Sequence, residues 1–347
     1  MKTKTLLEAT SKILPAVDNK GLVPEFQHLF FDGHYVEATN GSMFIRAELD
    51  EEVPTFAVEA AVFHSLLKTI QDDEIEIAVK EKAVSIKTKS IKTELGLPEK
   101  KLVSSINFDV EEWKEVPENF LRGLFLCRYT ACPDQTAGPL TGVWVGDDAI
   151  LSCDRWRISL YSLSVKMANM IIPVDMIDQV QRYADQVEGY AVQNGTIYFN
   201  LGKAKIGAKL LSGEYPSENL IKSLAQVDDA VKLSLSKDLK KRISEAGKRQ
   251  NIIQTKALEF DRVSNVTIDN GKMTLFAQNE SVGTIEETLG CEDAKDVKFE
   301  FAINPIFLTQ MFTEVTNLLY SQINSVCGFE GGSFIHLVKT KSETKDE

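Results

Sequence analysis

Residues 169–180 read NMIIPVDMIDQV, and similar stretches stand at residues 55–68 (TFAVEAAVFHSLLK) and 300–311 (EFAINPIFLTQM). Each begins with a short apolar run of the kind that forms a buried strand. Each then continues with apolar positions three and four residues apart, which is the spacing of an amphipathic helix. The sequence therefore predicts the same strand-then-helix unit three times along the chain.

The segments around these units repeat in the same order. After each helix, two alternating strands flank a turn, most clearly at Gln193-Asn194-Gly195, because Asn-Gly between such strands is a strong hairpin signal. Before each unit we expect a helix (residues 5–14, 118–130 and 236–247) and then a hairpin, the third of which turns at Asp269-Asn270-Gly271. Each repeat therefore reads helix, hairpin, strand, helix, hairpin.

The period of this repeat is far longer than that of a solenoid or a propeller blade, so each repeat is expected to be a whole domain. A chain of 347 residues suits two or three domains. The pattern loosens near residues 105 and 227, which predicts three similar α+β domains at 1–105, 106–227 and 228–340. Residues 341–347 form a polar tail that we expect to be disordered.

The composition limits the class of protein. A net charge of −12 argues against a protein that binds tightly in a DNA groove, because the footprint of such proteins is usually basic. No apolar run is long enough to span a bilayer, and the first residues lack the apolar stretch and cleavage site of a signal peptide. We therefore expect a cytoplasmic protein with no membrane partner.

The sulfur-containing and titratable residues form no recognisable catalytic or metal-binding pattern. The scattered cysteines indicate free thiols, and Cys127 and Cys132 fit no common zinc spacing. The sequence has no phosphate loop, no dinucleotide-binding fingerprint and no zinc-protease motif. We therefore expect no enzyme, no catalytic residue, no metal and no cofactor. The cysteines are Cys127, Cys132, Cys153, Cys291 and Cys327, and the isolated histidines are His28, His34, His64 and His336.

Several segments resemble one family in order and spacing. Residues 140–145 (LTGVWV) lead into residues 150–159 (ILSCDRWRIS), which resembles the middle domain of the β clamp of bacterial replicative polymerases, where an LNG strand precedes ATDGHRL. Residues 211–217 (LSGEYPS) resemble its DGx[FY]PDY segment, and residues 301–308 (FAINPIFL) its third-domain FNxxYL segment. The chain is thus similar to the bacterial-type DNA sliding clamp, the β subunit of DNA polymerase III. Its departures indicate a divergent member, which a phage or mobile-element origin would explain.

The resemblance implies a head-to-tail homodimeric ring of clamp domains, with helices lining the hole and antiparallel sheets outside. Such a ring is a processivity factor that encircles double-stranded DNA and tethers a DNA polymerase during replication. It would need a clamp loader to open it. A topological hold also accounts for the acidity, because a ring needs no net attraction to DNA and an acidic exterior discourages binding outside it.

A basic helix face is the candidate DNA contact. On the helix that starts near residue 237, four lysines fall on one side, and Leu239, Ile243 and Ala246 fall on the other. Taken alone, this pattern also fits a solvated amphipathic helix. The DNA-facing candidates are Lys237, Lys240, Lys241 and Lys248, with Arg122, Arg128, Lys68 and Arg182 on other predicted helices as weaker ones.

The resemblance also implies an apolar pocket between the second and third domains, which takes short peptides from partner proteins. The pocket residues carried across are Leu140, Cys153, Arg155, Trp156, Arg157, Ile158, Pro216, Leu220, Ile221, Asn304, Phe307, Ile335, His336, Leu337 and Val338. Plain core packing is the alternative for Leu140, Ile158 and Phe307. Arg155-Trp156 replaces the family's Gly-His, which predicts added bulk and positive charge and a changed peptide preference.

The resemblance also implies a dimer contact between an edge strand that ends the first domain and the third domain of the partner. The matching strand is residues 90–95 (SIKTEL), and the opposing helix ends at Lys248-Arg249. These residues predict a more electrostatic and therefore salt-dependent dimer. The alternative function is a three-domain protein-interaction scaffold that keeps the pocket but does not encircle DNA.

Overall fold

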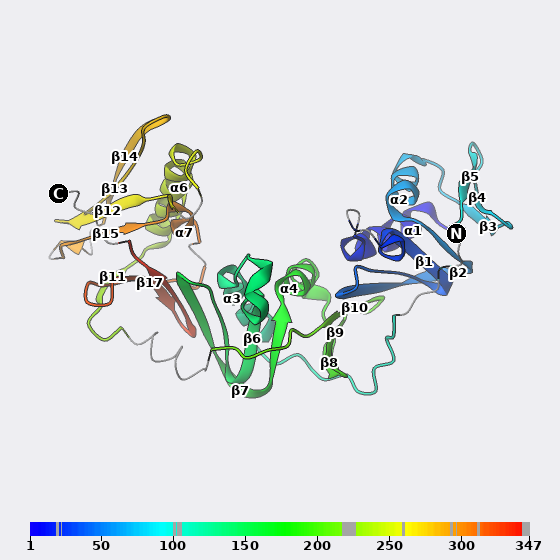
Figure 1. The fold of residues 1–347 in the computed structure, drawn as a ribbon, viewed down its shortest axis with the longest axis horizontal. Helices are drawn as coiled ribbons and strands as arrows, with labels where there is room; N and C mark the ends of the chain where they lie inside the picture. The colour runs from blue at the N-terminus through cyan, green and yellow to red at the C-terminus, as the bar shows by residue number, and fades with distance from the viewer. Residues whose placement is uncertain are drawn as a thin grey trace. The chain divides into compact units, whose positions relative to one another are not determined.

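The fold is mixed α and β, with every sheet antiparallel (Figure 1). The computed structural model describes residues 1–341, except residues 19–20, 22, 100–101, 103–105, 217–226, 259–260, 292–293, 296 and 311–312. The chain divides into two compact units. Unit 1 comprises Met1–Leu121 and Ile172–Leu211, and unit 2 comprises Arg122–Ile171 and Ser212–Glu347.

Unit 1 contains a five-stranded sheet in the order β1-β2-β10-β9-β8 and a three-stranded sheet in the order β3-β4-β5. Phe31 anchors part of its core, with ring centroids 4.5 Å from Phe56 and 5.3 Å from Phe63. Its elements are α1 (Thr3–Ile13), η1 (Leu14–Ala16), η2 (Pro24–Gln27), β1 (His28–Thr39), β2 (Met43–Glu59), α2 (Ala60–Thr69), β3 (Glu76–Val79), β4 (Ala83–Lys87), β5 (Lys92–Gly96), α4 (Val174–Gln181), η5 (Ala184–Gln186), β8 (Gly189–Gln193), β9 (Thr196–Asn200) and β10 (Ala204–Lys209).

Unit 2 contains a six-stranded sheet in the order β11-β16-β17-β18-β7-β6 and a four-stranded sheet in the order β14-β13-β12-β15. Two elements, α3 (Phe120–Cys127) and β7 (Arg157–Pro173), begin in one unit and end in the other. The remaining elements are η3 (Arg128–Thr130), η4 (Gln135–Thr141), β6 (Gly142–Cys153), β11 (Val231–Ser234), α6 (Lys237–Ile253), β12 (Ser264–Asp269), β13 (Lys272–Asn279), β14 (Gly283–Gly290), β15 (Phe299–Ile303), α7 (Pro305–Leu308), β16 (Asn317–Ser321), β17 (Val326–Gly331) and β18 (Phe334–Lys339).

The predicted hairpin turns lie where the sequence places them. Asn194 and Gly195 join β8 to β9 with φ values of 52° and 69°, and Asn270 and Gly271 join β12 to β13 with φ values of 48° and 75°. Positive φ at both central residues is what a type I′ turn requires, and Asn and Gly tolerate it best. These local signals therefore fix the register of both hairpins.

The helix predicted to end at Gly247 continues to Ile253, so the prediction of its end was wrong. Gly247 is an interior residue of α6 that allows close packing of α7. A Cβ placed on it would lie 2.9 Å from both the carbonyl oxygen of Pro305 and the Cβ of Leu308. The glycine therefore serves helix contact instead of ending the helix.

The third helix of the strand-then-helix units is shorter than its apolar spacing predicts. It covers only Pro305–Leu308, and the amide of Thr309 closes the turn on the carbonyl of Ile306. Met311 and Phe312, which the spacing included, lie outside the described residues. The α+β class is confirmed. The recurring order holds only in part. In the first two repeats the second strand of the hairpin and the strand that follows it form one continuous strand, β2 and β7, and three strands instead of two follow the second helix of each repeat. The boundary near residue 105, most of the linker before residue 227 and residues 342–347 of the tail also lie outside the described part, so the domain limits stay predictions.

Candidate functional site

The apolar candidates on β7 and β18 share one face of the six-stranded sheet. Ile158 pairs with Leu337 and Leu160 pairs with Ile335, and directly opposed residues of antiparallel strands point to the same side. A cluster of Leu151, Cys153 and Leu160 lies beneath this face, and Leu140, Trp144, Ile158, Tyr215 and Ile335 pack against it. The structure therefore brings Leu140, Cys153, Ile158 and Ile335 together as predicted.

Tyr215 ties the segment after β10 to this cluster. Its hydroxyl accepts a hydrogen bond from the amide of Cys153 at 3.2 Å and donates one to the carbonyl of Gly142 at 3.4 Å. Burial raises the pKa of the Cys153 thiol to about 11, so this sulfur stays protonated and packs as an apolar group. Cys153 thus contributes to the apolar packing of this cluster.

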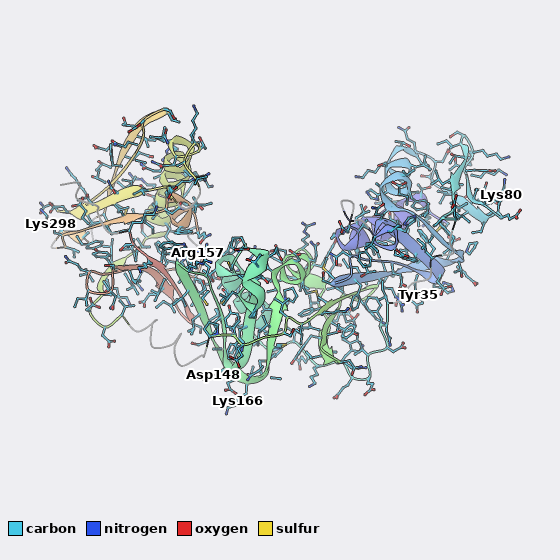
Figure 2. The ribbon with its side chains drawn as sticks, viewed as in Figure 1. Tyr35, Lys80, Asp148, Arg157, Lys166 and Lys298 are labelled. Carbon is cyan, nitrogen blue, oxygen red and sulfur yellow. The ribbon has the colours of Figure 1, made fainter. Side chains whose placement is uncertain are left out.

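The turn between β6 and β7 is built around Asp154. Its carboxylate accepts hydrogen bonds from the amides of Trp156 and Arg157, both at 2.7 Å, and from the Arg157 guanidinium at 2.7 and 2.9 Å. The guanidinium of Arg157, whose position in the fold is labelled in Figure 2, also lies close to Phe307. It is 4.7 Å from the centre of that ring. Asp154 therefore neutralises Arg157 and leaves Trp156, which is 43% exposed, at the surface.

His336 does not face the apolar cluster. It follows Ile335 on β18, so its side chain points to the opposite side of the sheet. It is fully buried, with Nδ1 2.8 Å from the hydroxyl oxygen of Ser159. Burial, with a smaller contribution from Arg157, lowers its pKa to about 3. Val338 is also fully buried and lies on the same side as His336.

The remaining pocket candidates are spread over several elements. The Asn304 side chain accepts a hydrogen bond from the amide of Ile306 at 3.1 Å and so caps α7, which is a structural role. Arg155 is exposed and Pro216 is half-buried. Leu220 and Ile221 lie outside the described residues. Sequence reasoning missed Asp154, Trp144 and Tyr215, although an aspartate two residues before an exposed turn residue is a recognisable Asx-turn signal.

The four lysines predicted on α6 line one cavity together with Thr313 and Val315. Lys237, Lys241 and Lys248 are exposed. Lys240 instead donates to the carbonyls of Thr313 and Val315, at 2.9 and 2.6 Å. Three of the four lysines therefore present their ammonium groups to solvent.

The weaker DNA candidates fall into two groups. Arg122 forms an ion pair with Glu314, and Arg128 folds back over the Tyr129 ring, with its guanidinium 4.0 Å from the ring centre. Lys68 and Arg182 are exposed. The structure thus engages both arginines on α3 and η3 within the chain, a feature that the sequence did not reveal.

None of the five cysteines takes part in a disulfide. Over the residues that the structure describes, no three His, Cys, Asp or Glu side chains are grouped as a metal site would need. Within the same residues, no helix is long and apolar enough to cross a membrane.

Comparison with solved structures gives full-length matches. The DNA polymerase III beta chain of Streptococcus pneumoniae superimposes with a TM-score of 0.82 at 14% identity, covering 98% of each chain. The DNA polymerase III subunit beta of Pseudomonas aeruginosa gives 0.78 at 17% identity over 99% of each chain. The beta sliding clamp of Caulobacter crescentus gives 0.79 at 16% identity over 99% of this chain and 98% of that one.

The chain has the DNA sliding-clamp fold. By sequence alone, no family model and no curated protein matches it. The clamp fold is therefore carried by a strongly diverged sequence, and its coverage of full-length clamps fits three domains in one chain. Divergence at this level also explains why only short segments of the clamp motifs are recognisable.

Proposed function

We propose that this protein is a DNA sliding clamp, a non-catalytic ring subunit that encircles duplex DNA and tethers a DNA polymerase and other replication proteins. The observation that carries the proposal is the match of the whole chain to beta clamps, with a TM-score of 0.82 over 98% of both chains. A match that omitted a third of the chain would leave the ring incomplete, whereas this one covers 98% of it.

Ring closure is supported by two sheet edges. β10, the last of the three strands after the second helix of the second repeat, pairs with the long strand β2 of the first repeat. In the same way β18, the last strand of the third repeat, pairs with the long strand β7 of the second repeat. The corresponding strands β5 and β14 are each the last strand of their sheets. Because an unprotected edge strand invites pairing with another chain, β5 of one copy is proposed to pair antiparallel with β14 of a second copy.

The internal pairings give this proposed dimer a register. β5 follows β4 as β10 follows β9, which aligns Lys92 with Lys205, the residue opposite Arg46. We align the pair of buried Ala277 with Ile285 on β13 and β14 with the pair of buried Ala38 with Ile45 on β1 and β2, and this alignment sets Glu286 at the position of Arg46. Lys92 of one copy thus faces Glu286 of the other.

This register supports the electrostatic dimer expected from the sequence, with one correction. The helix end at Lys248-Arg249 is not a helix end, and Arg249 forms an ion pair with Glu287 of its own chain at 2.6 Å. The pairing of β5 with β14 therefore supplies the opposite charges, and Arg249 is already neutralised.

DNA contact is proposed for the exposed lysines Lys237, Lys241 and Lys248 on α6. Contacts of this kind are non-specific and weaken with salt, because each releases counterions from the DNA. A topological ring needs only a few of them, which agrees with a net charge of −12.

Partner binding is proposed at the apolar face formed by Leu140, Cys153, Ile158, Ile335 and Leu337. Apolar concavities with a few polar groups are common peptide sites, and an extended peptide fits beside a sheet. The exposed Trp156 at its rim offers a flat surface to such a peptide.

The decisive experiment is retention on circular and linear DNA. Nicked circular plasmid is loaded with the protein, a clamp loader and ATP, and the mixture is gel-filtered before and after linearisation. We expect protein to stay with circles and to be lost from linear DNA through its free ends.

The scaffold alternative is favoured by one observation, namely that Arg122, Arg128 and Lys240 are all engaged within the chain. Failure of retention on circles with a competent loader would support the scaffold. Equal retention on both DNA forms would mean ordinary DNA binding and would also overturn the clamp.

A further inference from the structure

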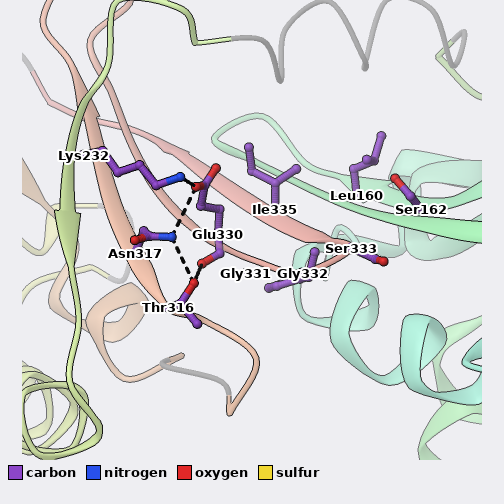
Figure 3. A pocket seen from close by; sticks show the side chains of 11 residues that line it. Leu160, Ser162, Lys232, Thr316, Asn317, Glu330, Gly331, Gly332, Ser333 and Ile335 are labelled. Carbon is purple, nitrogen blue, oxygen red and sulfur yellow. Dashed lines mark hydrogen bonds and ion pairs between the residues drawn. The ribbon is translucent and has the colours of Figure 1, made fainter.

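A cavity of about 360 Å³ adjoins the apolar face of the six-stranded sheet (Figure 3). Leu160 and Ile335, which belong to or pack on the cluster described above, form its apolar side. Its polar side is formed by Lys232, which makes an ion pair with Glu330, and by Asn317. The cavity therefore shares Ile335 with the proposed peptide site and extends across the sheet to Lys232 on β11.

The five-stranded sheet of unit 1 contains the same arrangement one repeat earlier. Lys205 pairs with Asn200 as Ile335 pairs with Glu330, and Tyr190 pairs with Phe199 as Leu318 pairs with Phe329. In the segment before α3, Lys114 forms a β-bridge with Tyr190 of β8. On β11, Leu233 pairs with Leu318 in the corresponding way, so Lys114 and Leu233 occupy equivalent positions. The residue at the position of Lys232 is therefore Trp113.

In unit 1 this position is filled by an aromatic side chain from the chain itself. Trp113 packs on a cluster of Phe108, Ala191 and Tyr198. It also covers Gly189, since a Cβ there would lie 3.9 Å from Trp113. In unit 2 the equivalent side chain is Lys232, which extends toward Glu330 and leaves the space beside Leu160 and Ile335 open.

We propose that this cavity binds an aromatic side chain of a partner peptide, in the place that the Trp113 ring occupies one repeat earlier. The inference rests on the proposed function, because the peptide is the one anchored on Ile158 and Leu337. The peptide is then held at two places on the sheet. The partner's sequence therefore needs an aromatic residue in addition to the residues that contact Ile158 and Leu337.

The chemistry of the cavity favours an aromatic ring over a charged group. Leu160 and Ile335 offer an apolar surface, and a ring beside the ammonium of Lys232 gains a cation–π interaction. The ion pair of Lys232 with Glu330 leaves no net charge to attract an anion. Gly332 at the rim has no atom within 4 Å of a built Cβ, so the flat face of a ring can approach the backbone there.

The test uses a fluorescein-labelled peptide that copies residues 106–115 of this chain (INFDVEEWKE) and the same peptide with Trp113→Ala. Binding to the full-length protein is followed by fluorescence anisotropy. We expect the tryptophan peptide to bind roughly tenfold more tightly than the alanine peptide.

Filling the cavity from within removes this preference. Lys232→Trp places a ring where Trp113 stands one repeat earlier, and Ser162→Trp blocks the cavity from β7, so both variants are expected to bind the two peptides equally. Lys166→Trp, at an exposed position of β7 that does not line the cavity, is the matched control and is expected to keep the preference. Thermal unfolding of each variant establishes that it is folded.

The outcomes separate this inference from the proposed function. Equal affinity of the wild-type protein for the two peptides, or no binding of either, would overturn the aromatic site and leave the DNA-retention result unaffected. Discrimination between the peptides by a protein that is not retained on circular DNA would keep the aromatic site and overturn the clamp.

Discussion

Asp154 illustrates how one residue organises the candidate site. The side chains of Asp154 and Arg157 are only 9% and 10% exposed, so their ion pair is largely removed from water. Removing one partner of such a pair leaves the other charge buried and uncompensated. The turn that presents Trp156 also depends on the same carboxylate, because it accepts hydrogen bonds from the backbone amides of Trp156 and Arg157.

We therefore expect Asp154→Ala to lower the free energy of unfolding by about 3 kcal/mol. Urea denaturation followed by circular dichroism measures the change. Asp50→Ala is the control, because Asp50 and its partner Lys203 are 52% and 71% exposed, and its effect should stay below about 1 kcal/mol. Equal losses for the two variants would contradict a special role for Asp154.

His336 predicts a pH dependence of stability. Its pKa is lowered from 6.5 to about 3 in the folded protein by burial, with a smaller effect of Arg157. Between these values the unfolded chain binds a proton that the folded chain does not, so stability falls as pH decreases. Relative to His336→Gln, the wild-type protein should lose about 1.4 kcal/mol per pH unit between pH 6 and pH 4. Parallel stability curves for the two proteins would show that His336 titrates normally.

At the scale of elements, the sequence predicts the features that depend on residues close together in the chain. The turns at Asn194-Gly195 and Asn270-Gly271 carry their own conformational preference, and the apolar spacing reveals the repeated strand and helix. The predictions that were wrong concern features that depend on contacts between residues far apart in the sequence. Gly247 looks like a helix end until α7 is packed against it, and Lys240 looks exposed until the carbonyls of Thr313 and Val315 are placed beside it.

The candidate site shows the same division. Ile158 and Leu337 were recognised through family-like segments, and the register of β7 with β18 confirms that they share a face. His336 was grouped with them because it is adjacent in sequence, whereas strand alternation turns it to the other side. The cavity beside Lys232 was not foreseen, because it is lined by residues of β7, β11, β16, β17 and β18, which are brought together only by folding.

The edge strands β5 and β14 yield a prediction for the proposed dimer. If Lys92 faces Glu286 of the partner copy, Lys92→Glu places two like charges opposite each other and should weaken dimerisation roughly tenfold or more at low salt. Glu286→Lys should do the same, and the double variant should restore most of the affinity. Analytical ultracentrifugation at low and high salt measures this, and additive losses in the double variant would rule out the register.

For the whole molecule, the proposed clamp function makes a net charge of −12 compatible with DNA binding through topology. A protein that holds DNA by charge alone needs a basic surface, whereas a closed ring needs only to avoid expelling the duplex. The contact proposed on α6 can therefore be small. Affinity for DNA and retention on DNA are then separate quantities, and they respond differently to mutation.

This separation can be tested with Lys237→Glu, Lys241→Glu and Lys248→Glu combined. We expect the triple variant to show weaker salt-dependent binding to short linear duplexes, with a shallower dependence of log Kd on log salt, by about one unit per lost phosphate contact. Protein that has been loaded should still be retained on circles and released on linearisation. The control reverses the exposed lysines Lys166, Lys209 and Lys272 on β7, β10 and β13, which changes the net charge equally. If both triple variants weaken DNA binding to the same degree, the effect is one of total charge, and α6 is not the DNA-facing element.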